Sequence, residues 1–359
     1  MTTSARVTRT AFLTGAATLL TFCLGTAANA QSEPETIRVG WCTQTLNVTV
    51  APFAIAQKMG WFEEKGIKVD IVPLPGSSDC ARNVATGEID TAVAAPEPVA
   101  LLKAQGVDLK IFYTAYRRNI FGLAVPEDSD IQTYADLKGK TVGVTSMASV
   151  GVIIARAVAA DAGLDAQSDM RIVVSGQPAP SAALLKSGEV DALSHWDTNY
   201  LLVERAGVPM RRIEDEQISS FPANSFIALE SALEEKGDQL AAVARGYAMG
   251  TIFAIENPEA ASNIMYEIYP EVLPTGLDRE TVLSEDAAAL EERAKVWVLE
   301  EGRQWGESVP EVYQGYLDWL RQWDIVKGDV SGEEIIDNRR IEAINSFDPE
   351  EIRKAAQEN

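Results

Sequence analysis

The sequence is short of histidine and cysteine, the residues that most zinc sites require. Its 359 residues contain a single histidine, His195, and three cysteines. Only two of the cysteines, Cys42 and Cys80, follow the signal peptide predicted below. Because a structural zinc site takes four ligands, one histidine and two cysteines that can pair with each other exclude multi-histidine and cysteine-rich zinc sites by counting. All three residue types of a Ser-His-Asp triad are present, but no G-x-S-x-G turn presents a serine as a nucleophile. We therefore expect no catalytic residues, no metal site and no cofactor.

Positive charge is also scarce. Lys and Arg total 31 against 53 Asp and Glu, which gives a net charge of −22. A protein of this charge repels nucleic acid and anionic lipid, so neither is an expected partner. We expect a monomer that binds a small molecule and no nucleic acid.

No apolar run is long enough for a clear membrane span, which needs roughly 20 residues. The most pronounced run covers 11–24, follows two arginines and precedes the small-x-small pattern Ala28-Asn29-Ala30. These features predict a secretory signal peptide over residues 1–30, cleaved after Ala30. The mature protein would then be periplasmic.

Only two cysteines follow the predicted cleavage site, Cys42 and Cys80. Disulfides form in an oxidising compartment such as the periplasm. The pair is therefore either bridged or present as two buried thiols.

From residue 36 onward, short β-branched runs alternate with amphipathic helical ones. This pattern predicts a parallel-rich sheet covered by helices. The pattern then restarts, and Gly87-Glu88-Ile89-Asp90 reappears as Gly188-Glu189-Val190-Asp191 at the matching place. Each glycine supplies the left-handed residue that ends a helix. The chain thus contains one α/β unit twice, which implies a cleft between two units, with crossings expected at 120–125 and 224–229.

Polar loops follow the expected strands of both units, at the carboxyl ends where open α/β sheets bind ligands. The candidate ligand residues from these loops and their surroundings are Trp41, Gln44, Asn47, Ser77, Ser78, Asn119, Ser146, Ser149 and Gln177. Several of the loops begin helices, whose free N–H groups favour an anionic group such as sulfonate, carboxylate or nitrate. Alternatively, serines such as Ser78 and Ser149 only cap their own helices.

Two acids stand at nearly equivalent positions after the third strand of each unit: Glu97, and Asp197 next to Trp196. They either sit in the first turns of their helices, where a carboxylate suits the dipole, or bind an ammonium group of the ligand. In the second interpretation the Trp196 ring adds a cation–π attraction. His195 stands where the first unit has Ala94, so we assign it no shared role.

Several segments, taken in order, resemble solute-binding proteins of ABC importers. The closest group serves taurine, aliphatic sulfonates, nitrate and pyrimidine precursors. The matching segments are 47–69, 76–78, 86–92, 134–144, 188–192 and 316–320. The resemblance covers nearly all of the chain after residue 30.

The resemblance implies a type II periplasmic binding fold, with a ligand cleft between two lobes that close by a hinge motion. The implied lobes are 36–122 with 225–359, which adds C-terminal helices, and 123–224. A further implied partner is an inner-membrane ABC permease. Where taurine-type members have Trp-x-Pro and a Ser-Ser-Pro-like turn, this chain has Trp196-Asp197-Thr198 and Pro96-Glu97-Pro98. Both departures add acid to the cleft.

We therefore expect a periplasmic receptor without catalytic activity that captures a small anionic or zwitterionic organic solute, similar to taurine or a sulfonate. One alternative is a receptor for a pyrimidine-type, other nitrogen-heterocyclic or aromatic ligand, with Trp41 and Trp196 stacked on its ring. Another is a small-molecule enzyme of the same fold, which the missing base and metal ligands disfavour.

Overall fold

The computed structural model describes residues 4, 8, 33–274 and 276–359. The expected signal peptide lies outside the described residues, apart from Ser4 and Thr8. The segment Pro34–Asn359 forms one compact unit.

Two five-stranded sheets organise this unit. Sheet A has the order β2-β1-β3-β10-β4, and its strands are β1 (Glu35–Trp41), β2 (Ile67–Pro73), β3 (Thr91–Ala94), β4 (Leu109–Thr114) and β10 (Ser225–Leu229). Sheet B has the order β7-β6-β8-β5-β9, and its strands are β5 (Phe121–Pro126), β6 (Thr141–Val144), β7 (Arg171–Val174), β8 (Ala192–Trp196) and β9 (Met210–Arg212).

The two sheets have the same plan, as the repeated sequence pattern predicts. In each sheet three strands are parallel, and one strand from elsewhere in the chain pairs antiparallel with the third of them. Gly87 and Gly188 both have positive φ, at 74° and 73°, as expected for helix-ending glycines. The expected α/β fold with two parallel-rich sheets is confirmed.

The repeated aspartates, Asp90 and Asp191, have a matching structural role that the sequence did not reveal. The Asp90 carboxylate accepts the backbone N–H of Arg38 in β1 at 2.8 Å. The Asp191 carboxylate accepts the backbone N–H of Thr141 in β6, also at 2.8 Å. Each aspartate therefore fixes the first strand of its own unit against the turn that enters the third strand.

The expected crossings at 120–125 and 224–229 are wrong, because these segments are strands β5 and β10. The chain crosses between the sheets at 115–120 and again at 213–224, a segment that includes the short helix α7 (Glu216–Ser220). β5 lies between β8 and β9, and β10 lies between β3 and β4. Their apolar composition therefore reflects burial inside a sheet.

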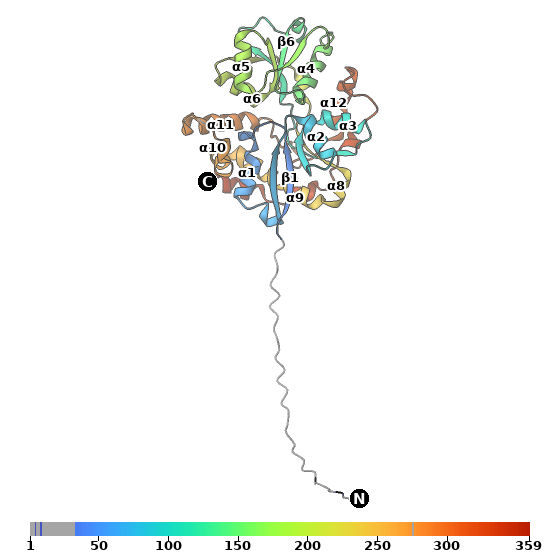
Figure 1. Ribbon diagram of the computed structural model, residues 1–359, viewed down its shortest axis with the longest axis vertical. Helices are drawn as coiled ribbons and strands as arrows, with labels where there is room; N and C mark the ends of the chain where they lie inside the picture. Colours follow the sequence, from blue (N-terminus) through green and yellow to red (C-terminus); the bar gives the residue numbers. More distant parts are fainter. Residues whose placement is uncertain (1–3, 5–7, 9–32, 275) are drawn as a thin grey trace. The chain divides into compact units, whose positions relative to one another are not determined.

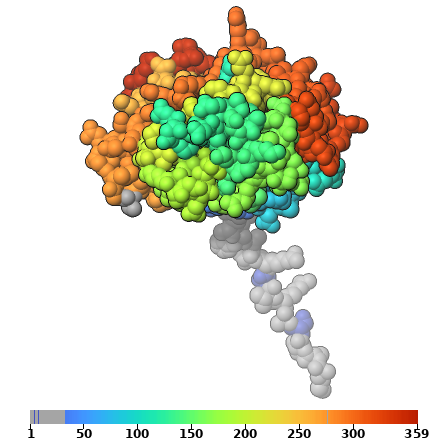
Figure 2. All heavy atoms as spheres, turned by 90° about the horizontal axis from the view of Figure 1, so that it is seen from above, coloured from blue at the N-terminus to red at the C-terminus, as the bar shows by residue number. Residues whose placement is uncertain are grey.

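Helices cover both sheets (Figure 1). Those between the strands of sheet A are α1 (Ala51–Lys58), α2 (Ser77–Ala85) and α3 (Pro96–Lys103), and those between the strands of sheet B are α4 (Val150–Asp161), α5 (Pro178–Ser187) and α6 (Asp197–Arg205). Figure 1 shows α1 and α2 on either side of β1, and α4 and α5 on either side of β6. Figure 2 shows the segment that holds sheet B, in green, as one continuous surface on the viewed face.

The chain after β10 is mostly helical, as expected. Its helices are α8 (Glu230–Glu235), α9 (Gly237–Glu256), α10 (Pro258–Ile268), α11 (Arg279–Ala294), α12 (Pro310–Gln322), α13 (Gly332–Ile335), α14 (Ile341–Ile344) and α15 (Pro349–Gln357). Helix α9 packs on α1 and on strands β1 and β2, and α13 packs on β4. The C-terminal helices thus enlarge the core of the part of the molecule that contains sheet A.

Candidate ligand-binding site

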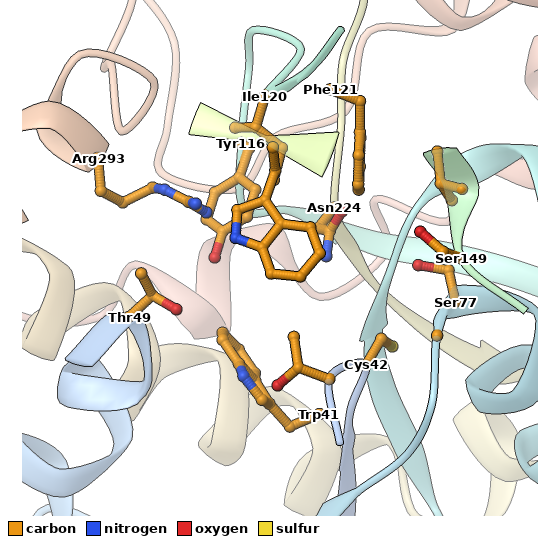
Figure 3. Close-up of a pocket in the computed structure, with 14 residues that line it drawn as sticks. Trp41, Cys42, Thr49, Ser77, Tyr116, Ile120, Phe121, Ser149, Asn224 and Arg293 are labelled. Carbon is orange, nitrogen blue, oxygen red and sulfur yellow. The ribbon is translucent and has the colours of Figure 1, made fainter. Parts of the chain in front are cut away.

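A cleft between sheets A and B receives residues from both sheets, both crossings and helix α11. Its volume is about 430 Å³, part of which is open to solvent. The lining residues are Trp41, Cys42, Thr43, Thr49, Gly76, Ser77, Tyr116, Ile120, Phe121, Ser149, Val150, Trp196, Asn224 and Arg293 (Figure 3).

The cleft lies at the carboxyl ends of the parallel strands, where the sequence places it. Trp41 is the last residue of β1, and Trp196 is the last residue of β8. Ser77 begins helix α2, and the hydroxyl of Ser149 caps α4 by accepting the backbone N–H of Gly151 at 3.1 Å. Figure 3 shows Ser77 and Ser149 next to each other on one wall. Two helix N-termini, one from each half, therefore meet at the cleft.

Both crossings contribute polar lining residues, and they are hydrogen-bonded to each other. Tyr116, in the first crossing, donates its backbone N–H to the carbonyl of Asn224 at 3.0 Å. Its own carbonyl accepts the N–H of Ala223 at 2.9 Å. The side chains of Tyr116 and Asn224 consequently reach the cleft from the region where the chain passes between the sheets.

Arg293 of helix α11 is a cleft residue that sequence reasoning missed. Figure 3 shows its guanidinium pointing into the cleft beside Tyr116. The guanidinium carbon lies 4.5 Å from the centroid of the Tyr116 ring, within cation–π range. Its Nη2 donates to Oδ1 of Asp197 at 2.6 Å and to the hydroxyl of Thr198 at 3.3 Å.

The Arg293–Asp197 ion pair is buried, with side-chain exposures of 2% and 4%. Burial alone would lower the pKa of Arg293, but the adjacent Asp197 carboxylate raises it above its ordinary value. Arg293 is therefore protonated. Among the lining residues of the described cleft, Arg293 alone carries a charge.

Four buried polar atoms of the lining residues have no hydrogen-bond partner in the described structure: Nε1 of Trp41, Oη of Tyr116, Oδ1 of Asn224 and Nε of Arg293. Leaving a buried polar group unpaired costs roughly 1–3 kcal/mol, so such groups normally have a ligand or water as partner. The set contains two N–H groups that donate, a hydroxyl that can donate or accept, and an amide oxygen that accepts. It can bind a molecule that carries both acceptors and a donor.

Four of the predicted ligand residues line the cleft, namely Trp41, Ser77, Ser149 and Trp196. The others lie outside its lining: Gln44, Asn47, Ser78, Glu97, Asn119, Ser146, Gln177 and Asp197. Gln44 is exposed, and Gln177 is the N-cap residue of α5. Asn47 accepts the N–H of Thr49 at 3.0 Å, and Asn119 accepts the N–H of Phe121 at 2.8 Å. Ligand contact at these four polar residues stays a prediction.

Two further candidates, Ser78 and Ser146, connect the two halves directly. The hydroxyl of Ser146, after β6, donates to the carbonyl of Pro75, after β2, at 2.8 Å. The backbone N–H of Ser78 donates to the carbonyl of Ala148 at 3.2 Å. These bonds close one rim of the cleft.

Glu97 and Asp197 both lie in the first turn of their helices, α3 and α6, as one of the two interpretations expects. Glu97 is 1% exposed, and its Oε1 accepts the hydroxyl of Tyr316 at 2.6 Å. Burial raises the pKa of Glu97 to about 7, although the bond from Tyr316 lowers it. Glu97 lies outside the cleft lining, and Asp197 is paired with Arg293. Binding of a ligand ammonium group by either carboxylate stays a prediction.

His195 is fully buried in sheet B and does not line the cleft. Its Nδ1 lies 2.9 Å from Oδ1 of Asn199, and its Nε2 lies 3.2 Å from the hydroxyl of Ser175. Burial lowers the pKa of His195 to about 4, against a smaller opposite effect of Asn199. The histidine is therefore neutral at neutral pH and belongs to the internal packing of sheet B.

Cys42 and Cys80 are joined by a disulfide, with their Cα atoms 5.9 Å apart. Cys42 directly follows β1 and lines the cleft, and Cys80 lies in α2. The bond thus ties the loop after β1 to the helix whose first residue, Ser77, also lines the cleft.

Within residues 33–274 and 276–359, no cluster of three or more His, Cys, Asp or Glu side chains could hold a metal ion. In the same part of the chain, no helix combines the length and the apolar character that crossing a bilayer needs.

One sequence signal could have identified Arg293. In α11, Asp286, Leu290 and Arg293 are spaced as one helix face, and all three are buried. A charge on the apolar face of an amphipathic helix indicates either a buried ion pair or a ligand contact. Its partner Asp197 is too distant in sequence for the pairing to be predicted.

Sequence and structure comparisons find similarity to binding proteins and to synthases. It is 24% identical to the formylaminopyrimidine-binding protein of Halalkalibacterium halodurans, over 68% of this chain and 74% of that protein. It is 23% identical to the 4-amino-5-hydroxymethyl-2-methylpyrimidine phosphate synthase of Legionella pneumophila, over 68% of this chain and 77% of that enzyme.

Among solved structures, the alkanesulfonate-binding protein SsuA of Xanthomonas axonopodis, bound to MOPS, is similar with a TM-score of 0.63 and 19% identity. The match covers 85% of this chain and 99% of that protein, and it shows that the fold is that of periplasmic binding proteins. The family described as NMT1/THI5 like matches residues 47–261, more than half of the sequence. The chain therefore belongs to the NMT1/THI5-like family.

Proposed function

We propose that this protein is the solute-binding component of an ABC importer and has no catalytic activity. In this proposal it works in the periplasm after removal of residues 1–30, as a monomer. It captures a small molecule in the cleft between sheets A and B and delivers it to an inner-membrane permease. The binding-protein fold and the similarity to the formylaminopyrimidine-binding protein support this assignment.

We further propose two lobes that close on the ligand, with lobe 1 formed by 36–122 and 225–359 and lobe 2 by 123–224. The two hydrogen-bonded crossings, at 115–120 and 213–224, would act as the hinge. The bonds from Ser146 to Pro75 and from Ser78 to Ala148 would then form on closure, because each joins residues of different lobes.

The ligand we propose is a small, planar nitrogen heterocycle of the pyrimidine type. The single observation that carries this choice is the cleft lining itself. Aromatic side chains of Trp41, Tyr116, Phe121 and Trp196 surround the unpartnered N–H donors, hydroxyl and amide acceptor of the lining. Aromatic side chains bind flat rings by stacking, and heterocycles offer ring acceptors beside amino or N–H donors.

A sulfonate-type anion is the second candidate. The guanidinium of Arg293 and the N-termini of α2 and α4 at the cleft favour it. The ion pair with Asp197 opposes it, because the positive charge of Arg293 is already compensated.

A thermal-shift and calorimetry panel tests both candidates. The mature protein would be measured with uracil, cytosine, methanesulfonate, taurine and nitrate. We expect a heterocycle to raise Tm and to change tryptophan fluorescence, while mass spectrometry finds it unaltered. A product would establish an enzyme instead, and binding of sulfonates alone would select the second candidate.

Trp41→Leu should abolish the fluorescence response and weaken heterocycle binding, because the ring would lose a stacking partner. The matched control is Trp323→Leu, since Trp323 is only partly buried and lies outside the cleft. Equal affinities of the two variants would contradict the stacking proposal.

A further inference from the structure

The buried ion pair between Arg293 and Asp197 joins helix α11 to the first turn of α6 at the edge of the cleft. Only Arg293 belongs to the cleft lining, whereas Asp197 lies behind it. The carboxylate also accepts the backbone N–H of Thr198 at 2.6 Å, which fixes its position. Asp197 therefore holds Arg293 in place and supplies the opposite charge without contacting the cleft itself.

This arrangement determines the net charge that a ligand meets. Among the described lining residues Arg293 alone is charged, and the carboxylate 2.6 Å from its Nη2 cancels that charge locally. Charges in a water-poor interior act strongly on each other, so the compensation is far more complete than at a solvated surface. The whole chain, at −22, adds long-range repulsion of anions.

The geometry leaves Arg293 useful as a hydrogen-bond donor even though its charge is compensated. Nη2 is occupied by Asp197 and Thr198, whereas Nε is buried and unpartnered. A ligand acceptor such as a ring nitrogen or carbonyl oxygen can pair with the free N–H groups. Because the acceptor need not be anionic, a neutral molecule satisfies the site.

We propose that Asp197 sets the charge preference of the cleft, making it select neutral or internally neutral solutes and reject free anions. The proposal rests on the proposed function, because it takes the cleft to be the solute site. In this role Asp197 positions Arg293 and sets the charge selectivity, and it does not itself bind an ammonium group of the ligand.

The first test uses the wild-type protein and one matched ligand pair. Uracil is neutral, and orotate is the same ring with a carboxylate. We expect calorimetry to give a Kd for uracil that is at least about tenfold lower than the Kd for orotate. A tighter complex with orotate would overturn the proposal.

The second test is Asp197→Asn, which keeps an oxygen to accept the bonds from Arg293 and Thr198 and removes only the charge. We expect the affinity for orotate and methanesulfonate to rise about tenfold or more and that for uracil to change little. Both anions should also raise the Tm of this variant more than that of the wild type, since they would compensate a buried unpaired cation.

The matched control is Asp286→Asn. Asp286 is another buried acid, on the same helix as Arg293, and it contacts Tyr266 and Arg205 away from the cleft lining. The Asp286→Asn substitution should leave unchanged the ratio between the affinity for anions and the affinity for neutral ligands. An equal rise in anion affinity in both variants would indicate a general charge effect and overturn the role of Asp197.

Arg293→Gln gives the reciprocal test if Asp197→Asn does not fold. It exposes an uncompensated carboxylate, so protonated amines such as methylamine should begin to bind while orotate does not. An unchanged ligand preference in Arg293→Gln would overturn the proposal. If the wild type binds none of the heterocycles but Asp197→Asn gains anion affinity, the proposed ligand class fails while the role of Asp197 stands.

Discussion

His195 is the single histidine of the chain, and its surroundings contain no charge that would stabilise the imidazolium form. Both ring nitrogens pair with neutral groups, the side chains of Asn199 and Ser175. The folded protein therefore favours the neutral ring, and its pKa falls to about 4 from the ordinary value of 6.5.

A lowered histidine pKa predicts loss of stability at acidic pH. The unfolded chain binds a proton near its ordinary pKa, whereas the folded protein does not until about pH 4. As pH falls from about 6.5 to 4, the unfolding free energy of the wild type should decrease by about 3 kcal/mol relative to that of His195→Gln. Urea unfolding of both proteins at several pH values measures this difference.

A direct check of the same prediction is available by NMR, because the one histidine gives one imidazole signal. We expect that signal to titrate only near pH 4. A midpoint near 6.5 in the folded protein would contradict the buried position.

Glu97 predicts the opposite pH dependence. Its pKa in the folded protein, about 7, exceeds the ordinary value of 4.5. The stabilisation of the folded state by the protonated carboxyl is therefore fully present below pH 4.5 and is lost as pH rises through 7. Glu97→Gln keeps an acceptor for Tyr316 and cannot ionise. Its unfolding free energy relative to wild type should rise by about 3 kcal/mol between pH 5 and 8.5.

The control for Glu97 is Glu351→Gln, a change at an exposed residue of helix α15. Its stability relative to wild type should not vary with pH in this window. The prediction for Glu97 fails if both variants show the same pH profile.

At the scale of elements, the loops before α2 and α4 approach so closely that one of them requires glycine. A Cβ atom on Gly76 would overlap the backbone of Ala148 across the cleft rim. The backbone of Gly76 is extended, so the requirement is one of space and has no conformational origin. The contact exists only while the two halves are close.

Gly76→Ala should therefore weaken ligand binding by about tenfold or more, because closure would meet a steric clash. The stability of the unliganded protein should change little, since an open form can accept the methyl group. Calorimetry and the radius of gyration with and without ligand measure the two effects. The control is Gly315→Ala in α12, where no atom lies within 4 Å of the added Cβ; loss of affinity there as well would refute the argument.

The sequence pattern predicted the elements well and the site only in part. Trp41, Ser77, Ser149 and Trp196 were predictable because each follows or ends a strand at a known edge of a parallel sheet. Arg293 was missed, because the buried charge on its helix face does not by itself reveal that tertiary packing of the C-terminal segment brings this helix to the cleft. Tyr116 was missed because the first crossing was expected a few residues too late in the chain, and Asn224 was missed because its segment was taken only as a connection.

At the scale of the whole molecule, the disulfide predicts a dependence of stability on redox conditions. Cys42 and Cys80 are 38 residues apart in the sequence. In the chain-entropy model such a loop contributes about 4 kcal/mol. Cys42→Ser with Cys80→Ser should lose about that much unfolding free energy, and reducing agent should lower the Tm of the wild type alone.

Thiol titration of the denatured, unreduced protein counts the cysteines that are not in a disulfide. A chain cleaved after Ala30 should show no free thiol, whereas a chain that keeps Cys23 should show one. Two free thiols in the cleaved protein would contradict the disulfide.

The position of β10 has a consequence for the order of folding. In the described part of the chain, β4 joins sheet A only through β10, which comes after all the strands of sheet B. Sheet A therefore stays incomplete until residues 225–229 return to it, and much of its assembly depends on contacts distant in sequence. An N-terminal fragment that ends before Ser225 would leave β4 without a neighbouring strand, so the two halves cannot be produced separately by a single cut in the chain.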